Sequence, residues 1–409
     1  MTTNFLGRIL TGAGTRGRQR SGVQSAPVKP RSRTASLVAV AVVTLVATWQ
    51  RARAVDRLQP DYDEMPYLHA AYRYAERMEP GRWGEIPDVT ENNEHPPLVK
   101  MAYGAAVKAT GAPEPDLDKL EAYKPMPDSA RPAFRAARWT SAVPGIAQVA
   151  ITAVVHPLAG LFLAVELHHA KYTSQAYVEA IPGLFFMLSI FLFERATRLA
   201  GGARRPAPGV ALAVVAFALL GAAAAGKYTY GAVGALTLAP LTIVAFPRRP
   251  LLWAALVAVS MVAFVALDPY LWPDPIGRIG SSVGFHFAYG QSEHVKKAAL
   301  PWYFQAVWMV TSSPAISFRE VFPFELLSLV LLPLAAIGAP LAARRRPVWA
   351  CVALIGSVFL LVWPVKWPQY LLLVLAPLCI CAAHAPAAVV ALVRRLRSRS
   401  AQKPRPIAE

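Results

Sequence analysis

The sequence is poor in charged residues, and acids are scarcer than bases. Only 16% of its 409 residues are charged, whereas soluble domains carry about 25%. The hydrophobic residues make up 55% of the chain and come in long blocks that do not alternate with polar residues. This composition excludes an ordinary soluble domain and predicts an all-α polytopic membrane protein.

Cysteine is also scarce, which excludes a disulfide framework. The three cysteines, Cys351, Cys379 and Cys381, all lie inside apolar segments. Cys379 and Cys381 are two residues apart and therefore point to different faces of a helix. We expect small buried thiols and no zinc site.

The formal net charge of +18 would suit a nucleic-acid-binding protein. The arginines, however, stand in short clusters between apolar blocks, such as "FPRRP" at 246–250, "RRRP" at 344–347 and "RRLRSR" at 394–399. Such clusters are typical of cytoplasmic loops under the positive-inside rule. We therefore predict membrane lipids and no nucleic acid among the partners.

The chain ends are basic and the middle is apolar. Residues 1–36 are predicted to be a disordered basic cytoplasmic tail, 37–392 the transmembrane domain, and 393–409 a second basic cytoplasmic tail. The first apolar run, 37–49, is short for a membrane span. A cleaved signal peptide is one interpretation. We favour an uncleaved anchor that continues past Trp49, with Arg51 and Arg53 snorkelling to the interface.

Apolar runs predict about ten transmembrane helices, with eight to eleven as alternatives. Ten spans place both termini and the Arg clusters on the cytoplasmic side, which predicts a multi-pass protein of the cell membrane. They place two long polar loops, 61–135 and 268–321, outside the cytoplasm. The predicted spans are 37–49 with its continuation, 139–155, 157–168, 176–193, 208–226, 229–246, 251–267, 322–342, 348–364 and 369–392.

The first polar loop opens with two acids, Asp63 and Glu64, just beyond the first span. Apolar and aromatic residues from Tyr67 to Met78 recur at helical spacing, which predicts an amphipathic helix along the membrane interface. The acids could serve only to cap this helix, because carboxylates stabilise a helix N-terminus. They could also be catalytic.

A second motif, "NNEHPPL" at 92–98, places Glu94 and His95 before two prolines. Pro-Pro cannot continue a helix and imposes an extended turn. The turn would present Glu94 and His95 together, either as part of a site or as a loop brace.

These motifs, in this order, resemble the GT-C superfamily of membrane glycosyltransferases, in particular the protein O-mannosyltransferase and aminoarabinose-transferase-like group. The resemblance covers most of residues 37–392. It includes "EHPPLVK" (94–100), "RAARWTS" (135–141), "YVEAIPGLFF" (177–186), "DPYLWPDP" (268–275) and "KWPQYLLLVLAP" (366–377).

The resemblance implies a GT-C fold and an inverting transfer of a hexose or pentose. The donor would be a polyprenyl-phosphate-linked sugar, and the acceptor an extracytoplasmic protein, lipid or glycan. Asp63 matches the family's proposed general base, Glu64 an orienting acid, and Glu94 an acid near a metal and the lipid phosphate. His95 stands where one branch has a lysine, so phosphate binding at that position departs from the pattern.

The leaving phosphate needs positive charge at the outer membrane interface. Arg138, Lys227 and Lys366 are the candidates, with interfacial snorkelling as the alternative for each. By resemblance, Glu179 matches a family acid and could support the site or pair with Arg138. We also place Tyr67 and His286 in support, and we predict a possible divalent metal ion on Glu94 and His286, although no ligand spacing demands one.

Two other functions are compatible with the sequence. A transporter or flippase of polyprenyl lipids would place polar groups at mid-membrane, often in two related halves, and neither feature is apparent. A family member that binds polyprenyl phosphates without catalysis is the second alternative. The intact acids at 63, 64 and 94 favour the enzyme.

Overall fold

The computed structural model describes residues 33–202, 207–298, 300–311 and 326–401. Within these ranges the chain is helical and contains no β-strand, as the sequence predicts. Most of the predicted tail 1–36, the end of the second polar loop and the last eight residues, 402–409, lie outside the described residues. An all-α membrane architecture is therefore confirmed for the described part of the chain.

The described helices fall into a longer and a shorter group. The longer helices are α2 (Arg33–Arg57), α5 (Arg131–Val155), α8 (Ala180–Gly202), α9 (Ala207–Gly226), α10 (Tyr228–Ala245), α11 (Pro250–Leu267), α12 (Pro275–Gly290), α15 (Leu326–Arg345), α16 (Pro347–Val362) and α18 (Ala385–Ala401). The shorter helices are α3 (Glu64–Arg77), α4 (Leu98–Thr110), α6 (Pro157–Val165), α7 (Leu167–Tyr172), α13 (Glu293–Ala298), α14 (Phe304–Val310) and α17 (Leu372–Ala383). Single 3-10 turns are η1 (Trp83–Asp88), η2 (Leu117–Lys119), η3 (Pro269–Leu271) and η5 (Pro368–Leu371).

Six helical segments among the described residues are long and apolar enough to cross a membrane. Helices also stand at the other predicted spans, in α5, α6, α15 and α16. The protein is thus multi-pass, and the total of ten spans stays a prediction. The six segments are Thr34–Arg57, Ala180–Ala200, Ala207–Gly226, Tyr228–Ala245, Pro250–Leu267 and Pro368–Ser398.

The first helix continues past Trp49 to Arg57, as the anchor interpretation predicts. The snorkelling predicted for Arg51 is wrong. Its side chain is fully buried, donates to Thr173 Oγ1 at 3.0 Å and lies 2.5 Å from His169 Nδ1. A guanidinium can remain in a bundle interior when side chains of another helix supply partners, and a single apolar run gives no sign of those partners.

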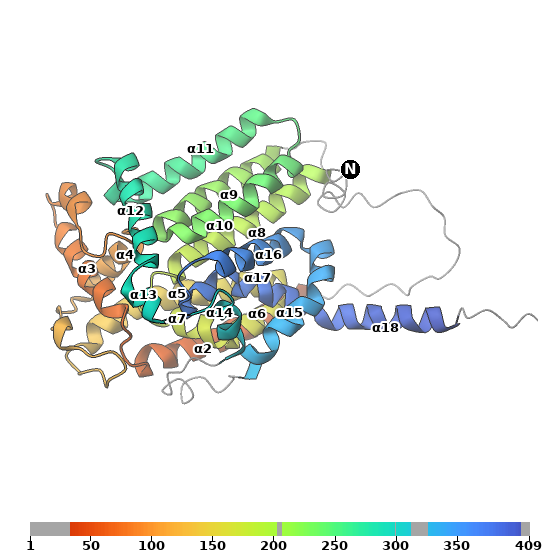
Figure 1. Ribbon diagram of the computed structural model, residues 1–409, viewed down its shortest axis with the longest axis horizontal. Helices are drawn as coiled ribbons and strands as arrows, with labels where there is room; N and C mark the ends of the chain where they lie inside the picture. Colours follow the sequence, from red (N-terminus) through yellow and green to blue (C-terminus); the bar gives the residue numbers. More distant parts are fainter. Residues whose placement is uncertain (1–32, 203–206, 299, 312–325, 402–409) are drawn as a thin grey trace, which may run out of the picture.

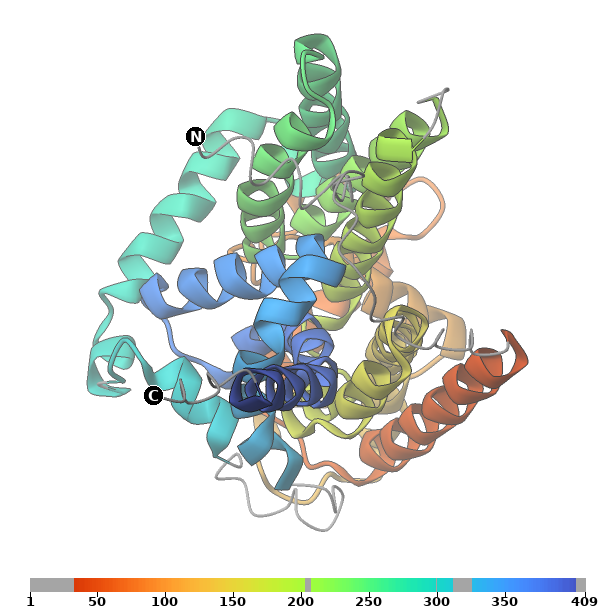
Figure 2. The same cartoon turned by 90° about the vertical axis from the view of Figure 1, so that its right-hand side faces the viewer.

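Long helices run along the length of the molecule, with the first-loop helices α3 and α4 at one end (Figure 1). Helix α12 lies at that same end, while α18 projects from the opposite end toward the viewer of Figure 2. One end of the bundle therefore collects the polar loops that hold the motifs singled out in the sequence.

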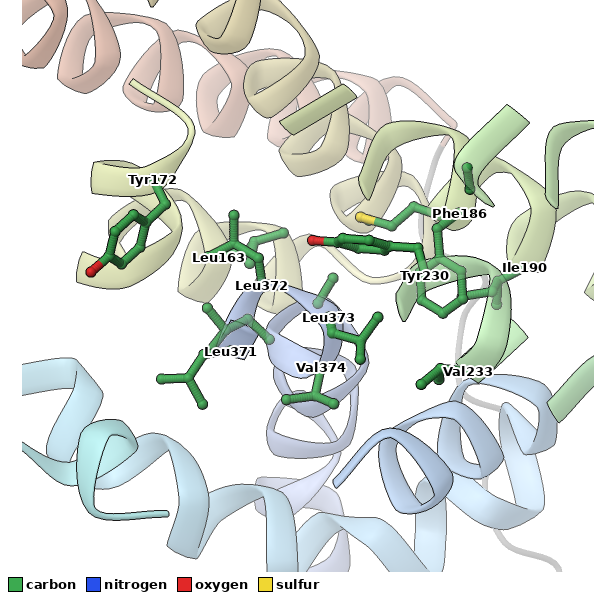
Figure 3. Packing of buried hydrophobic residues seen from close by; sticks show 14 of the residues in the cluster. Leu163, Tyr172, Phe186, Ile190, Tyr230, Val233, Leu371, Leu372, Leu373 and Val374 are labelled. Carbon is green, nitrogen blue, oxygen red and sulfur yellow. The ribbon is translucent and has the colours of Figure 1, made fainter. Parts of the chain in front are cut away.

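Helix α17 forms the centre of the core, and all of its residues are buried. Its start packs Leu372 and Leu373 among Phe186 of α8 and Tyr230 of α10, as Figure 3 shows. Helix α15 approaches α17 so closely that a Cβ at Gly338 would lie 1.9 Å from the carbonyl oxygen of Cys381. Only glycine allows this approach, and the packed centre gives the loops at the end of the bundle a rigid base.

Candidate functional site

Asp63 immediately precedes α3, but its side chain does not cap the helix. Its Oδ2 accepts a hydrogen bond of 3.2 Å from Gln369 Nε2 in η5, far away in the sequence. The capping interpretation therefore does not describe Asp63. The carboxylate faces the turn that precedes the central helix α17.

The environment of Asp63 raises the pKa of its carboxyl to about 7. Burial is the main cause, because it disfavours the charged form, and the negative charges of Glu179 and Asp61 add to it. Lys227 and Lys171 act in the opposite direction. A carboxylate with a pKa near neutrality is suited to accept a proton at physiological pH.

The pKa of Asp61 is shifted in the opposite direction from that of Asp63. Its Oδ2 forms a buried ion pair of 2.8 Å with Lys171 Nζ, and its Oδ1 accepts from the Tyr123 hydroxyl at 2.9 Å. Burial opposes ionisation, but Lys171 and the hydrogen bonds from Tyr123 and Tyr177 outweigh it and lower the Asp61 pKa. Asp61 therefore stays ionised, and it was not among the residues singled out in the sequence.

Glu64 and Arg138 form a buried bidentate ion pair behind the site. Arg138 Nε and Nη2 donate to the two Glu64 oxygens at 2.8 and 2.7 Å. Arg138 also donates to the carbonyls of Val55, Leu58 and Gln59. These contacts engage the guanidinium on all sides and join the end of α2 to α5 and α3. Phosphate binding by Arg138 stays a prediction, and the geometry favours a brace.

Lys227 lies between α9 and α10 and forms an ion pair with Glu179, which precedes α8. Both side chains are buried. Lys227 Nζ also lies 4.6 Å from the centre of the Tyr370 ring. Glu179 thus pairs with Lys227, whereas the sequence analysis left open a supporting role in the site and a pair with Arg138.

Lys366 is also buried, but its ammonium is turned toward the end of α16. It donates to the carbonyls of Leu360 and Leu361, at 2.7 and 2.9 Å, and to that of Trp363. These carbonyls lack helical partners at a C-terminus, so Lys366 caps the helix. A role in phosphate binding stays a prediction for Lys366 as well.

Lys100 of α4 stabilises the turn that contains Glu94 and His95. The sequence analysis did not single out this lysine. The buried Lys100 ammonium donates to the carbonyls of Asn92 and His95. Burial lowers the Lys100 pKa to about 7. The Glu94 carboxylate accepts from the Asn92 side chain, within the same turn.

His95 connects the turn to the rest of the site. Its ring lies 5.8 Å from the Tyr67 ring and 5.9 Å from the His286 ring of α12, centre to centre. Burial, followed by the charges of Lys227 and Lys100, holds the His95 pKa well below its usual value. Burial and Lys227 lower the pKa of His286 in the same way, so both rings are neutral at pH 7.

A cavity of about 450 Å³ opens beside these groups. His95, Lys227 and His286 are among its polar lining, together with Tyr228 and Tyr370. Most of its wall is apolar and comes from α9, α10, α11, α12 and α16. The apolar wall includes Leu220, Met261, Phe264, Val283, Phe287 and Phe359.

The described residues contain no group of three or more His, Cys, Asp or Glu side chains that could hold a metal ion. His286 lies next to the turn that contains Glu94, since its ring is 5.9 Å from that of His95 and a hydrogen bond with the Glu94 backbone raises the His286 pKa. A divalent ion on Glu94 and His286 stays a prediction, since two protein ligands are fewer than a structural site employs.

The structure thus brings Asp63, Tyr67, His95, Glu179, Lys227 and His286 to one end of the bundle. The partners missed in the sequence are Asp61, Lys100, Lys171, Gln369 and Tyr370. Gln369 and Tyr370 stand in "VKWPQY", next to the predicted Lys366, so the sequence analysis recognised the motif but did not single out these two residues of it.

No protein-family model matches the sequence and no curated protein matches it, so the comparison depends on solved structures. ArnT from Cupriavidus metallidurans in the apo state has a TM-score of 0.58 and 15% identity over 90% of this chain. The same protein bound to undecaprenyl phosphate gives the same score and identity. The chain spans 61% and 64% of the length of these two structures.

Archaeal oligosaccharyltransferase AglB from Archaeoglobus fulgidus, solved with an inhibitory peptide and a dolichol-phosphate, is a second similar structure. Its TM-score is 0.50, with 12% identity, and the match covers 91% of this chain and 52% of AglB. Identities this low establish shared architecture alone. The chain shares the fold of ArnT and AglB, which is the GT-C fold that the sequence predicts.

Proposed function

We propose that the protein is an integral-membrane inverting glycosyltransferase. It would move a sugar from a polyprenyl-phosphate carrier to an acceptor hydroxyl on the non-cytoplasmic side. One observation carries the proposal: a buried carboxyl, Asp63, has a pKa of about 7 and lies within electrostatic reach of Lys227, which lines an apolar cavity. The GT-C fold supports it.

The donor would occupy the cavity with its isoprenoid chain along the apolar wall and its phosphate at the polar end. Lys227 supplies positive charge there, and the neutral rings of His95 and His286 supply hydrogen-bond donors. The similar structure of ArnT was solved with undecaprenyl phosphate, a carrier of this chemical class.

Asp63 would act as general base. It takes the proton of the acceptor hydroxyl as that oxygen attacks the anomeric carbon of the donor sugar. The bond from this carbon to the phosphate oxygen breaks in the same step, so the configuration inverts and a polyprenyl monophosphate leaves with the electron pair. Lys227 stabilises the charge that develops on the leaving phosphate.

The test is a transfer assay with the purified protein in lipid nanodiscs. Polyprenyl-phosphate sugars are supplied one at a time, and mass spectrometry follows the carrier lipids. Comparison of lipid-linked sugars and surface glycans in cells with and without the protein would identify both substrates. A protein that consumes no lipid-linked sugar in either setting would contradict the proposal.

We expect Lys227→Met to weaken binding of undecaprenyl phosphate about 10- to 100-fold, because the substitution removes the cation at the polar end of the cavity. Lys366→Met should raise the dissociation constant less than about threefold, since Lys366 donates to the carbonyls of α16. Lys108→Met, on the exposed face of α4, serves as a control. Equal losses at Lys227 and Lys366 would mean that Lys366 leaves its cap to bind phosphate.

We also expect a specific pH dependence. The base must be ionised to accept a proton, and kcat/KM reports the free enzyme. With the Asp63 pKa at about 7, kcat/KM should fall tenfold per pH unit below that value and level off above it. The measurement is kcat/KM in buffers of constant ionic strength. A value of kcat/KM that stays constant between pH 5 and 7 would exclude Asp63 as the base.

A further inference from the structure

Three acids lie close together at the catalytic end, and each has a different polar partner. Asp61 has Lys171 and Tyr123. Asp63 has a hydrogen bond from neutral Gln369. Glu179 has Lys227 on one carboxylate oxygen, while its Oε2 is buried without a hydrogen-bond partner among the described residues. The charge of Glu179 therefore depends on one lysine.

That lysine also faces the cavity. Lys227 lines the cavity wall, and its ammonium lies over the Tyr370 ring at 4.6 Å. It is the one Lys or Arg that lines the cavity in the described part of the chain. A single ammonium therefore has two competing anions: Glu179 in the empty protein and a phosphate when the donor is bound.

We infer that Lys227 exchanges partners during the reaction, leaving Glu179 when the donor phosphate enters and returning when the lipid monophosphate departs. This inference rests on the proposed function and assigns Glu179 as a positioning residue. It holds the ammonium at the polar end while the cavity is empty. When the donor binds, its carboxylate is left facing Asp63.

The exchange links donor binding to base strength. Glu179 and Asp61 favour the protonated form of Asp63, while Lys227 and Lys171 favour the ionised form. Withdrawal of Lys227 toward the phosphate weakens its compensation of Glu179, so Asp63 binds a proton more strongly. The base is therefore stronger in the donor complex than in the empty protein, because its pKa is higher there.

The other groups around Asp63 do not compete with this effect near neutral pH. Lys171 is already engaged by Asp61. The remaining titratable neighbours are tyrosines, which stay neutral there because burial raises their pKa values. Those outside the membrane-spanning segments are Tyr67, Tyr123, Tyr172 and Tyr289.

The test is Glu179→Gln, which keeps the shape and removes the charge. Lys227 would no longer have to leave an ion pair, so undecaprenyl phosphate should bind about fivefold tighter or more. The acid limb of the kcat profile should move to lower pH by about one unit, because the charge beside Asp63 is gone. A residue that only supports the fold would not tighten lipid binding.

Two further variants make the result specific. Glu194→Gln removes a buried acid at the other end of α8, where it pairs with Arg198 and Arg346, and should change neither quantity. Lys227→Met combined with Glu179→Gln should bind no tighter than Lys227→Met alone, because the gain requires the lysine.

The inference is overturned if the wild-type protein binds undecaprenyl phosphate and transfers sugar, but Glu179→Gln binds this lipid no more tightly than the wild type. It is also overturned if the acid limb of the kcat profile is at the same pH in both proteins. The proposed function would survive that result. Failure of the wild-type protein both to bind the lipid and to transfer sugar would instead reject the proposed function, and the inference with it.

Discussion

Asp63→Asn is expected to lower kcat by about 10²- to 10⁴-fold, the range for loss of a general base. The amide has nearly the shape of the carboxylate and can still bond Gln369, but it cannot take a proton from the acceptor. Binding of undecaprenyl phosphate should not weaken, because the phosphate contacts proposed above do not include Asp63. The measurements are single-turnover transfer in nanodiscs and lipid binding at the same pH.

Asp56→Asn is the matched control, because Asp56 lies near the end of α2 and its side chain is 52% exposed in an ion pair with Arg135. It should transfer sugar at the wild-type rate. Asp63→Asn also separates the alternative functions. A flippase would still move lipid between leaflets in this variant. A protein that binds lipid without catalysis would show no transfer in the wild type either.

Much of the fold follows from the sequence, because apolar blocks of membrane length leave the backbone few options besides helices. The amphipathic pattern after Asp63 correctly predicts α3, and prolines mark the starts of α6, α11, α12 and α16. The short run at 157–168 divides into α6 and α7, since Glu166 accepts from His169 N and starts a new helix. Local chemistry decides all of these features.

The pairing of charges could not be read from the sequence in the same way. Position and residue type single out Asp63, Glu179 and Lys227 as site candidates. Whether Glu179 pairs with Lys227 or Arg138 depends on how α5, α8 and α9 pack, which no local pattern reports. Lys366 shows the same limit, because a lysine between two tryptophans looks alike whether it caps a helix or binds a ligand.

Arg138→Met is expected to reduce the free energy of unfolding by about 3–5 kcal/mol. The substitution leaves the Glu64 carboxylate buried without its bidentate partner, and it removes donors from the carbonyls of Val55, Leu58 and Gln59. Unfolding of the purified protein by SDS in mixed micelles measures the effect. Arg135→Met, on the exposed face of the same helix, should cost no more than about 0.5 kcal/mol.

Adding Glu64→Gln to Arg138→Met should recover a large part of the loss, because it removes the uncompensated charge, while the amide oxygen still accepts from Asp61 N or from Ala176 N. If the double variant is as unstable as the single one, the loss of stability comes from the lost hydrogen bonds between Arg138 and the backbone carbonyls. If Arg138→Met has normal stability but binds undecaprenyl phosphate more weakly, the structural role of Arg138 is wrong. Arg138 would then act on the donor phosphate, as the sequence suggests, because an arginine needed only for structure cannot be removed without loss of stability.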